Sequence, residues 1–178
     1  MEVLRYEAPG WGVGEVAVHG ERLLYHELPW PGRFESDPNR PQGIPRIPVV
    51  SVAGESSRVG ASFARKVVRR LTRYFAGTAE AFDDLELDLS GYTPFQRALT
   101  GALRTIPRGE TVTYGELAAL AGRPGAPRAA GNFCAVSRFG IIVPCHRVVA
   151  STGLGSYGSF GTGYKQRLLD LEGARVPL

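Results

Sequence analysis

Polar and apolar residues alternate through the first 28 positions of the chain. The alternating segments are 3–6, 13–18 and 23–26, and turn-forming residues separate them at 9–10 and 19–21. An alternation with a period of two places one face of a strand in a core and the other face toward solvent. The pattern therefore predicts three strands joined by short turns, which is an antiparallel meander.

A loop and a helix are expected to follow the meander. Prolines and glycines crowd residues 29–48, which predicts a surface loop. Over residues 57–76 apolar side chains recur at helical spacing, so an amphipathic helix is expected to cover the sheet. Its arginine-rich face is interpreted as solvated, with nucleic-acid contact as the alternative. Apolar and polar residues alternate again at 85–89, which predicts a further strand. Ser90 and Gly91 then mark the boundary between two domains.

Three short helices are predicted at the start of the second half. Thr93, followed by Pro94 and Gln96, has the layout of a helix capping box, and Thr113 with Glu116 repeats it. Short helices joined by tight turns predict a helix-turn-helix with a small wing. The expected helices span residues 93–105, 113–120 and 127–136.

These elements predict an α+β protein with two domains. The first, residues 1–90, contains a sheet with one helix and is interpreted as a scaffold. The second, residues 91–178, contains the helix-turn-helix and the candidate chemistry.

Composition limits the chemistry that the chain can perform. Its two cysteines, Cys134 and Cys145, are too few for a disulfide framework or a thiolate zinc cage, so we expect no metal and no cofactor. A free nucleophilic thiol needs a reducing compartment.

No apolar run is long enough to span a bilayer, and the N-terminus lacks the layout of a signal peptide. We expect a cytoplasmic protein, nuclear in a eukaryote, with no membrane contact, and the net charge of +4 is compatible with an anionic partner.

Cys145 is the strongest candidate for a reacting group. The β-branched residues before Pro144 predict a short buried strand over 141–143, which would place Cys145 at a strand end. A thiol reacts as its thiolate, which a nearby cation or base stabilises at neutral pH. Arg147 can supply the cation, and His146 can supply the base. Because the side chains of neighbouring residues point apart, a bridging water would have to carry the proton from Cys145 to His146. The alternative is a buried free cysteine beside a hydrogen-bonded histidine.

Lys165 and Glu172 share a face of the last expected helix, 163–172. They are seven residues apart, and two leucines lie on the same face. A charged group that faces a core needs a polar partner. Either both helix ends are exposed, or Glu172 accepts a hydrogen bond from His146 and Lys165 lies near an active-site pocket.

Small residues surround Arg128 in the third helix of the second half. Ala129, Ala130, Gly131 and Ala135 permit close approach of another backbone. This composition is typical of tight helix packing, and it equally suits a helix that enters a DNA groove with Arg128 as its long probe.

Taken together, these motifs resemble those of the O6-alkylguanine-DNA alkyltransferases, also called methylated-DNA-protein-cysteine methyltransferases. The resemblance covers roughly the C-terminal half of the chain. It rests on the sequences TPFQ (93–96), IPRGETVTYG (106–115), RAAG (128–131), PCHRV (144–148) and LLDLEG (168–173).

The resemblance implies direct-reversal DNA repair. The Cys145 thiolate would take a methyl or other alkyl group from O6-alkylguanine, with O4-alkylthymine as an open second substrate. The resulting thioether is stable, so each molecule would act once as a self-inactivating cysteine S-methyltransferase.

The implied partner is double-stranded DNA, bound by a monomer through its minor groove. The lesion would be flipped out of the stack, with Arg128 filling the gap. The resemblance also implies a ribonuclease-H-like N-terminal sheet with a helix.

Roles for individual residues follow from the same resemblance. Glu172 would orient His146, which would take the proton of Cys145 through water, with Tyr114 and Lys165 beside the pocket. The implied DNA contacts are Tyr114, Gly115, Arg123, Arg128, Gly131 and Ser151. The implied substrate pocket consists of Tyr114, Cys145, Val148, Tyr157, Gly158 and Ser159, under a loop over 153–159.

The chain departs from the family's pattern at two places. Ser137 and Arg138 stand where the family usually has Asn-Pro, so the turn before the cysteine is expected to be held differently, with the Ser137 hydroxyl as the candidate. Beyond Tyr157 the family's paired glycines are interrupted, which leaves the size of the accepted alkyl group open.

Two rival functions remain at the level of sequence. A damage-recognition protein that binds alkylated DNA without transfer would lack the nucleophile, and Cys145 argues against it. A cysteine hydrolase that uses Cys145 and His146 would turn over repeatedly on an ester or amide, whereas alkyl transfer is stoichiometric.

Overall fold

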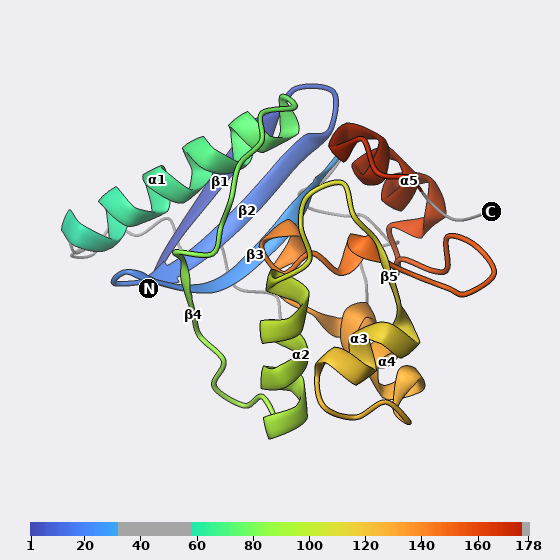
Figure 1. Cartoon of the computed structure of the whole chain (residues 1–178). Helices are drawn as coiled ribbons and strands as arrows, with labels where there is room; N and C mark the ends of the chain where they lie inside the picture. The colour runs from blue at the N-terminus through green and yellow to red at the C-terminus, as the bar shows by residue number, and fades with distance from the viewer. Residues whose placement is uncertain (32–57, 176–178) are drawn as a thin grey trace. The chain divides into compact units, whose positions relative to one another are not determined.

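The computed structural model describes residues 1–31 and 58–175. The chain divides into two compact units, Met1–Asp88 and Leu89–Leu178. Most of their helices and strands are labelled in Figure 1. The loop predicted over 29–48 lies outside the described residues from position 32 onward.

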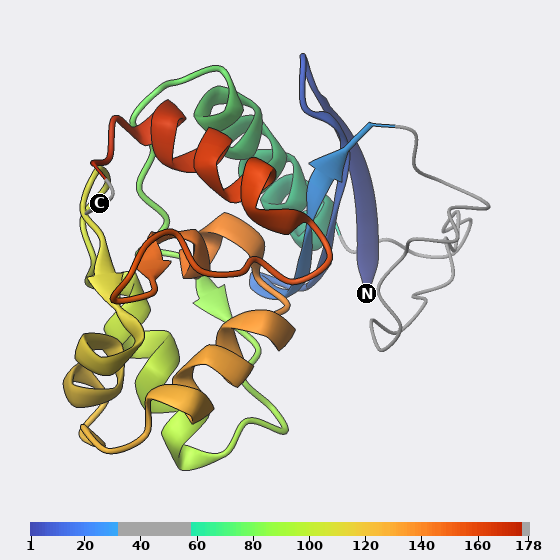
Figure 2. The ribbon, with the colours of Figure 1, turned by 90° about the vertical axis from the view of Figure 1, so that its right-hand side faces the viewer.

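The N-terminal unit is a four-stranded sheet with a helix on one face. β1 (Glu2–Ala8), β2 (Gly12–His19) and β3 (Arg22–Trp30) form an antiparallel meander, as predicted. α1 (Arg58–Phe75) packs along β1 and β2 (Figure 2). β4 (Glu86–Leu87) then pairs parallel to β3, so the strand order is β1-β2-β3-β4.

Two strands differ in length from the sequence prediction. β3 continues through Pro29 to Trp30, beyond its predicted end at residue 26. A proline is tolerated here because Pro29 lies where the register between β2 and β3 shifts, between the pairs Val13–Trp30 and Glu15–Glu27. The alternating segment at 85–89 forms only the two-residue β4.

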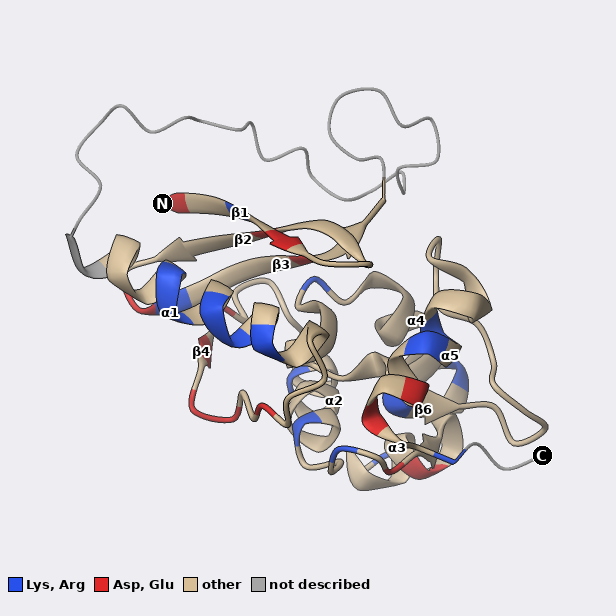
Figure 3. Ribbon diagram, turned by 90° about the horizontal axis from the view of Figure 1, so that it is seen from above, with Lys and Arg blue, Asp and Glu red and all other residues tan. Residues whose placement is uncertain are grey.

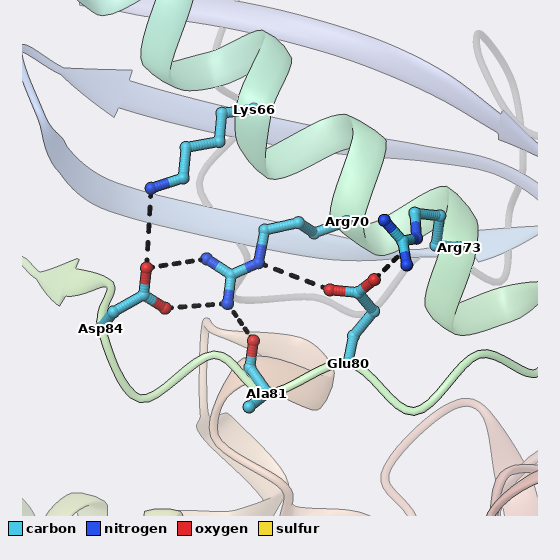
Figure 4. A network of polar contacts seen from close by, with 6 residues as sticks. All are labelled: Lys66, Arg70, Arg73, Glu80, Ala81 and Asp84. Atoms are coloured by element: carbon cyan, nitrogen blue, oxygen red, sulfur yellow. Dashed lines mark hydrogen bonds and ion pairs between the residues drawn. The ribbon is translucent and has the colours of Figure 1, made fainter.

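Ion pairs join α1 to the segment that follows it (Figure 4). Arg70 donates to both carboxylate oxygens of Asp84, at 3.0 and 2.8 Å. Lys66 Nζ lies 3.6 Å from Asp84, and Arg73 Nε lies 2.8 Å from Glu80. Lysines and arginines follow one side of α1 (Figure 3). Part of this basic face is therefore neutralised by acidic residues of the same unit.

The C-terminal unit consists of helices around a short parallel strand pair. Both predicted capping boxes are present: Thr93 with Gln96, and Thr113 with Glu116. α2, α3 and α4 pack against one another, as a helix-turn-helix requires. The elements are α2 (Pro94–Arg104), β5 (Val112–Thr113), α3 (Tyr114–Leu120), α4 (Pro127–Val136), β6 (Val148–Val149) and α5 (Gly161–Glu172). The predicted α+β class is confirmed.

The strand predicted over 141–143 is wrong. The chain forms two 3-10 turns instead, η1 (Gly140–Ile142) and η2 (Cys145–Arg147). Ile141, Ile142 and Val143 are consecutively buried, and their backbone bonds return to Phe139 rather than to a neighbouring strand. The β-branched run therefore indicated burial and not a strand.

None of the helices in the described ranges combines the length and the apolar character needed to cross a membrane.

The stability of the N-terminal unit can be tested at the interface between α1 and the sheet. Leu71 is fully buried on α1. Leu71→Ala should lower the free energy of unfolding by about 2–5 kcal/mol, because it removes buried methyl groups and leaves a cavity. Urea unfolding measures the change. The exposed neighbour Arg69 gives the control Arg69→Ala, which should stay within about 0.5 kcal/mol of the wild type. Equal effects of the two substitutions would contradict this account of the core.

Candidate active site

Cys145 lies at the start of η2 and is buried. Pro144 is the central residue of an inverse γ-turn (φ −79°, ψ 64°), in which Cys145 N donates to Val143 O at 2.8 Å. The side chain is 5% exposed. This 3-10 turn, rather than a strand end, sets the position of the thiol.

His146, the next residue in the turn, forms a buried pair with Glu172 at the end of α5. The distance from His146 Nε2 to Glu172 Oε1 is 3.0 Å. Both side chains are fully buried. The predicted contact between these residues is therefore present, and the alternative that Lys165 and Glu172 sit at exposed helix ends is excluded, since both are buried.

Arg147 fixes the same carboxylate from a second side. Its Nε donates to Glu172 Oε2 at 2.9 Å, and its Nη2 donates to Oε1 at 2.8 Å. Nη1 donates to the carbonyl of Ile106 at 2.5 Å. Such a two-point contact holds a carboxylate in one orientation. Residues 145–147 therefore connect the thiol to α5 within a single turn.

The charges of this cluster follow from its burial and its hydrogen bonds. Burial opposes ionisation of Glu172, but hydrogen bonds from His146 and Arg147 outweigh it and hold the pKa of Glu172 below its ordinary value. Burial lowers the pKa of His146, and Glu172 opposes that shift only in part. His146 is therefore neutral near pH 7. Because ionised Glu172 can only accept, Nε2 carries the proton of the ring, and Nδ1 is its basic atom.

Lys165 reaches into the same region from α5. It is fully buried, and its Nζ donates to Val148 O at 2.6 Å and to Ser156 O at 3.2 Å. Burial lowers the pKa of Lys165 to about 8, against the opposing charges of Cys134 and Cys145. The lysine thus ties strand β6 to the loop after it and contributes positive charge near the thiol.

Tyr114, the first residue of α3, faces this lysine. Its ring centre lies 5.9 Å from Lys165 Nζ. Gly131 and Gly155 lie against the ring, since a Cβ added at either position would be in ordinary van der Waals contact with it, at 3.6 and 3.4 Å. Burial raises the pKa of Tyr114, so the phenol keeps its proton at neutral pH.

Three aromatic rings hold the loop between β6 and α5. Tyr157 stacks on Tyr164 with centroids 6.3 Å apart, and Phe160 lies 5.0 Å from Tyr164. Gly158 and Ser159 are exposed at the tip between them. The loop is therefore anchored by its aromatic residues, while the two predicted pocket residues at its tip lie on the surface.

The residues predicted to contact DNA lie mainly on the surface of the C-terminal unit. Arg128 is exposed at the second position of α4, and Ser151 is exposed after β6. Arg123 is exposed between α3 and α4, with its guanidinium 5.0 Å from the centre of the Phe95 ring. Gly115 is half-buried in the first turn of α3. The other two predicted contacts lie at the cluster itself, because Tyr114 faces Lys165 and Gly131 lies against the Tyr114 ring.

Ser137 and Arg138, which depart from the family's pattern, hold the turn after α4 differently. The guanidinium of Arg138 lies 5.0 Å from the centre of the Tyr92 ring and 5.3 Å from that of Phe139. Its Nη2 donates to Ser90 O at 3.3 Å. The turn is therefore secured by the arginine and not by the Ser137 hydroxyl, whose Oγ is buried without a hydrogen-bond partner among the described residues.

The sequence prediction named Arg147 as a cation near the thiol but did not pair it with Glu172, and it gave Cys134 no place in the site. The position of Arg147 within PCHRV was a usable signal, because a charged residue in a buried segment needs a partner. Nothing in the sequence placed Cys134 beside Cys145, since that proximity depends on the path of the chain between α4 and η2. Among the described residues, no three His, Cys, Asp or Glu side chains gather so that they could hold a metal ion.

Known proteins resemble this chain over both of its units. The family described as 6-O-methylguanine DNA methyltransferase, DNA binding domain, matches residues 94–174. The methylated-DNA–protein-cysteine methyltransferase of Mycobacterium tuberculosis H37Rv is 50% identical over 111 residues, which are 62% of this chain and 66% of that protein, just under two thirds of its length. The corresponding protein of Mycobacterium leprae is 44% identical over 139 residues, 75% of this chain and 82% of that protein.

Solved structures agree with the sequence relatives. The crystal structure of Mycobacterium tuberculosis OGT in complex with DNA matches with a TM-score of 0.71 and 35% identity, over 96% of this chain and 92% of that chain. The O6-methylguanine-DNA methyltransferase of Pyrococcus kodakaraensis shares the fold, with a TM-score of 0.55 and 23% identity over 97% of this chain and 98% of that chain. With the PCHR turn and its buried histidine–glutamate pair in place, the chain belongs to the methylated-DNA–protein-cysteine methyltransferase family.

Proposed function

We propose that this protein repairs DNA by moving an alkyl group from O6-alkylguanine in double-stranded DNA to the sulfur of Cys145. The observation that carries the proposal is the His146–Glu172 pair, with 3.0 Å between Nε2 and Oε1, in the same turn as a buried thiol. A base that a carboxylate orients beside a nucleophile is the arrangement used to activate weak nucleophiles.

The reaction follows from the protonation states of the cluster. His146 takes the thiol proton at Nδ1, through a water, because its Nε2–H is committed to Glu172. The Cys145 thiolate attacks the saturated carbon of the alkyl group. A carbon–sulfur bond forms as the carbon–O6 bond breaks, and guanine leaves with its oxygen and takes up the proton. The thioether has no route back to a thiol, so each molecule reacts once.

The burial of Cys145 requires that the lesion come to the protein. A thiol that is 5% exposed cannot reach a base stacked inside a duplex. The nucleotide must be rotated out of the base stack, which costs roughly a few kcal/mol in lost stacking and base pairing. The surface residues Arg128, Arg123 and Ser151 are our candidates for the contacts that hold the duplex, and Arg128 is our candidate to fill the space left by the base. The relative from Mycobacterium tuberculosis was crystallised in complex with DNA, which supports a duplex partner.

A reactive thiol also favours a reducing compartment. Both cysteines of the chain are free. A thiol activated as a nucleophile is oxidised readily outside the cytosol. We therefore propose that the protein works in the cytoplasm.

Cys145→Ala should abolish transfer and preserve DNA binding. Wild-type protein incubated with duplex DNA containing O6-methylguanine should gain the mass of one methylene, located on the peptide that contains Cys145. The variant should gain none and should bind the same duplex with an unchanged Kd. Intact-mass measurement and a gel-shift titration test both points. DNA binding by the wild type without any mass gain would indicate a damage-recognition protein, and repeated turnover of an ester would indicate a hydrolase.

Glu172→Gln should slow transfer and change the pH dependence of stability. Loss of the charge that orients His146 should lower the rate by roughly 10²- to 10⁴-fold. Because the pKa of Glu172 is lowered in the folded protein, its ionised form stabilises the fold above the ordinary glutamate pKa of about 4.3. That stabilisation is lost as the pH falls through the lower folded-state value. Wild-type unfolding free energy should therefore decrease below about pH 4.3, and the variant should show a smaller decrease.

Single-turnover rates and urea unfolding at several pH values measure both effects. Asp170→Asn serves as the control, because Asp170 is exposed on the same helix and its carboxylate accepts a hydrogen bond from Gln166 Nε2 at 2.8 Å rather than from the cluster. It should leave the rate unchanged. A pH slope identical in the wild type and in Glu172→Gln would contradict the account of the carboxylate.

Arg128→Ala should impair repair of duplex DNA more than reaction with the free base. Without a side chain to fill the gap, extrusion becomes less favourable, and the duplex rate should fall by roughly tenfold, equivalent to about 1.4 kcal/mol. The rate with free O6-methylguanine should stay within about twofold, since no extrusion is needed. Arg175→Ala removes the same charge from another exposed position and serves as the control. Equal losses with both substrates would refute the role given to Arg128.

A further inference from the structure

Arg147 binds both oxygens of the Glu172 carboxylate, and it shares one of them with His146. Oε1 accepts from Arg147 Nη2 at 2.8 Å and lies 3.0 Å from His146 Nε2, while Oε2 accepts from Arg147 Nε at 2.9 Å. The side chains of His146 and Glu172 are fully buried, and that of Arg147 is 11% exposed. The base of the proposed reaction therefore contacts a carboxylate that already has a bidentate cationic partner.

The end of α5 is also held by contacts to its backbone. Arg108 Nη2 donates to Leu171 O at 2.7 Å. Gly109, whose φ is +84°, lies so close to Glu172 O that an added Cβ would be 3.2 Å from it. These contacts anchor the helix end without involving its carboxylate. The fork of Arg147 around the Glu172 side chain therefore adds something that anchoring of the helix does not require.

The balance of charge within the buried cluster suggests what the fork adds. A carboxylate removed from water is costly unless a cation or a proton compensates its charge. A histidine beside such a carboxylate is driven to take up a proton and form an ion pair with it. Here the guanidinium, which stays protonated throughout the physiological range, already supplies the positive charge. His146 can therefore donate its Nε2–H to Glu172 and remain neutral.

We propose that Arg147 is a positioning residue that acts through Glu172: it balances the charge of the carboxylate, so that His146 stays neutral and keeps a nitrogen that can take the Cys145 proton. A protonated imidazole has two donors and no acceptor, so it could not serve as the base. The proposal rests on the proposed function only in taking His146 as that base.

The charges that face His146 agree with this role. Burial lowers the pKa of His146, Glu172 opposes that shift, and the charges of Arg147 and Lys165 add to it. Glu172 and Lys165 both come from α5, whereas η1 (Gly140–Ile142), the other turn packed against η2, has no ionisable side chain. Lys165, with a pKa of about 8, is kept in every variant below. Differences among those variants therefore report the arginine that is changed.

The experiment reads the protonation state of His146 by 15N NMR of its imidazole ring in the intact, DNA-free protein. The chain has three histidines, and a His146→Ala sample identifies the signals of His146. In the wild type the ring should be neutral at pH 7, with its proton on Nε2. Arg147→Gln removes the charge and keeps a neutral donor. It should raise the midpoint of the His146 titration by roughly one to three pH units, the effect of one charge at close range.

Two matched substitutions separate the charge from hydrogen bonding and from anchoring. Arg147→Lys keeps the positive charge without the planar fork, so it should recover most of the shift seen in Arg147→Gln. Arg108→Gln removes the same charge from a residue that anchors the same helix end through Leu171 O. It should leave the His146 midpoint unchanged.

The same shift should appear in alkyl transfer. Because only neutral His146 accepts the proton, the acidic limb of the pH–rate profile with O6-methylguanine duplex should move to higher pH in Arg147→Gln. Below the new midpoint the rate should fall by roughly tenfold per pH unit, and it should recover above that midpoint. A purely structural role of Arg147 would lower the rate by the same factor at every pH.

The titrations decide the proposal. A His146 midpoint in Arg147→Gln equal to that of the wild type would overturn it, as would an equal shift in Arg108→Gln. A charged His146 in the wild type at pH 7, or a ring proton on Nδ1, would also overturn it. If Arg147→Gln does not fold, Arg147→Lys carries the test: a neutral ring at pH 7 supports the proposal, and a charged ring refutes it.

These outcomes are distinct from the outcome for DNA repair, since the titrations need no DNA. A shifted midpoint in Arg147→Gln, together with a wild type that gains no mass from O6-methylguanine DNA, would support the role of Arg147 and refute the proposed function. A mass gain from that DNA with no shift in the midpoint would do the reverse.

Discussion

The structure of the site depends on one buried carboxylate. Glu172 accepts hydrogen bonds from His146 at 3.0 Å and from Arg147 at 2.9 and 2.8 Å. A buried carboxylate is unfavourable unless it is paired and fully hydrogen-bonded. Here both partners come from the 3-10 turn that begins with Cys145. The requirement to satisfy Glu172 therefore fixes the turn against α5, and the position of the thiol follows from it.

The same constraint explains why charged residues occur in a buried segment. Arg147 also donates to the Ile106 carbonyl after α2, and Arg108 donates to Leu171 O in the last turn of α5. Lys165 holds the carbonyls of Val148 and Ser156. Each cation thus binds carbonyl oxygens at the ends of helices and strands or in the segments between them. This polar network closes the C-terminal unit around its irregular segment, and through Lys165 it places a positive charge near the thiol.

Local patterns in the sequence predicted the regular elements, and contacts between distant segments decided the rest. The capping boxes at Thr93 and Thr113 predict the first residue of two helices correctly, because the hydrogen bonds of a capping box are local. The segment 141–143 was misread as a strand because β-branched composition reports burial as much as conformation. The pairing of His146 with Glu172 was among the alternatives, since a charged residue on an apolar face needs a partner. Arg147 carried the same signal, whereas the contacts of Arg138 with Tyr92 and Ser90 were not accessible in this way, because they join segments about 45 residues apart in the chain.

The irregular backbone around Cys145 also has a chemical consequence. A strand would have used the neighbouring N–H groups in a ladder and pointed successive side chains to opposite faces. The 3-10 turn instead lets two consecutive residues, His146 and Arg147, reach the same carboxylate at the end of α5. The base is therefore oriented by the same turn that carries the thiol, and the geometry of the nucleophile and its base does not depend on a ladder of backbone hydrogen bonds.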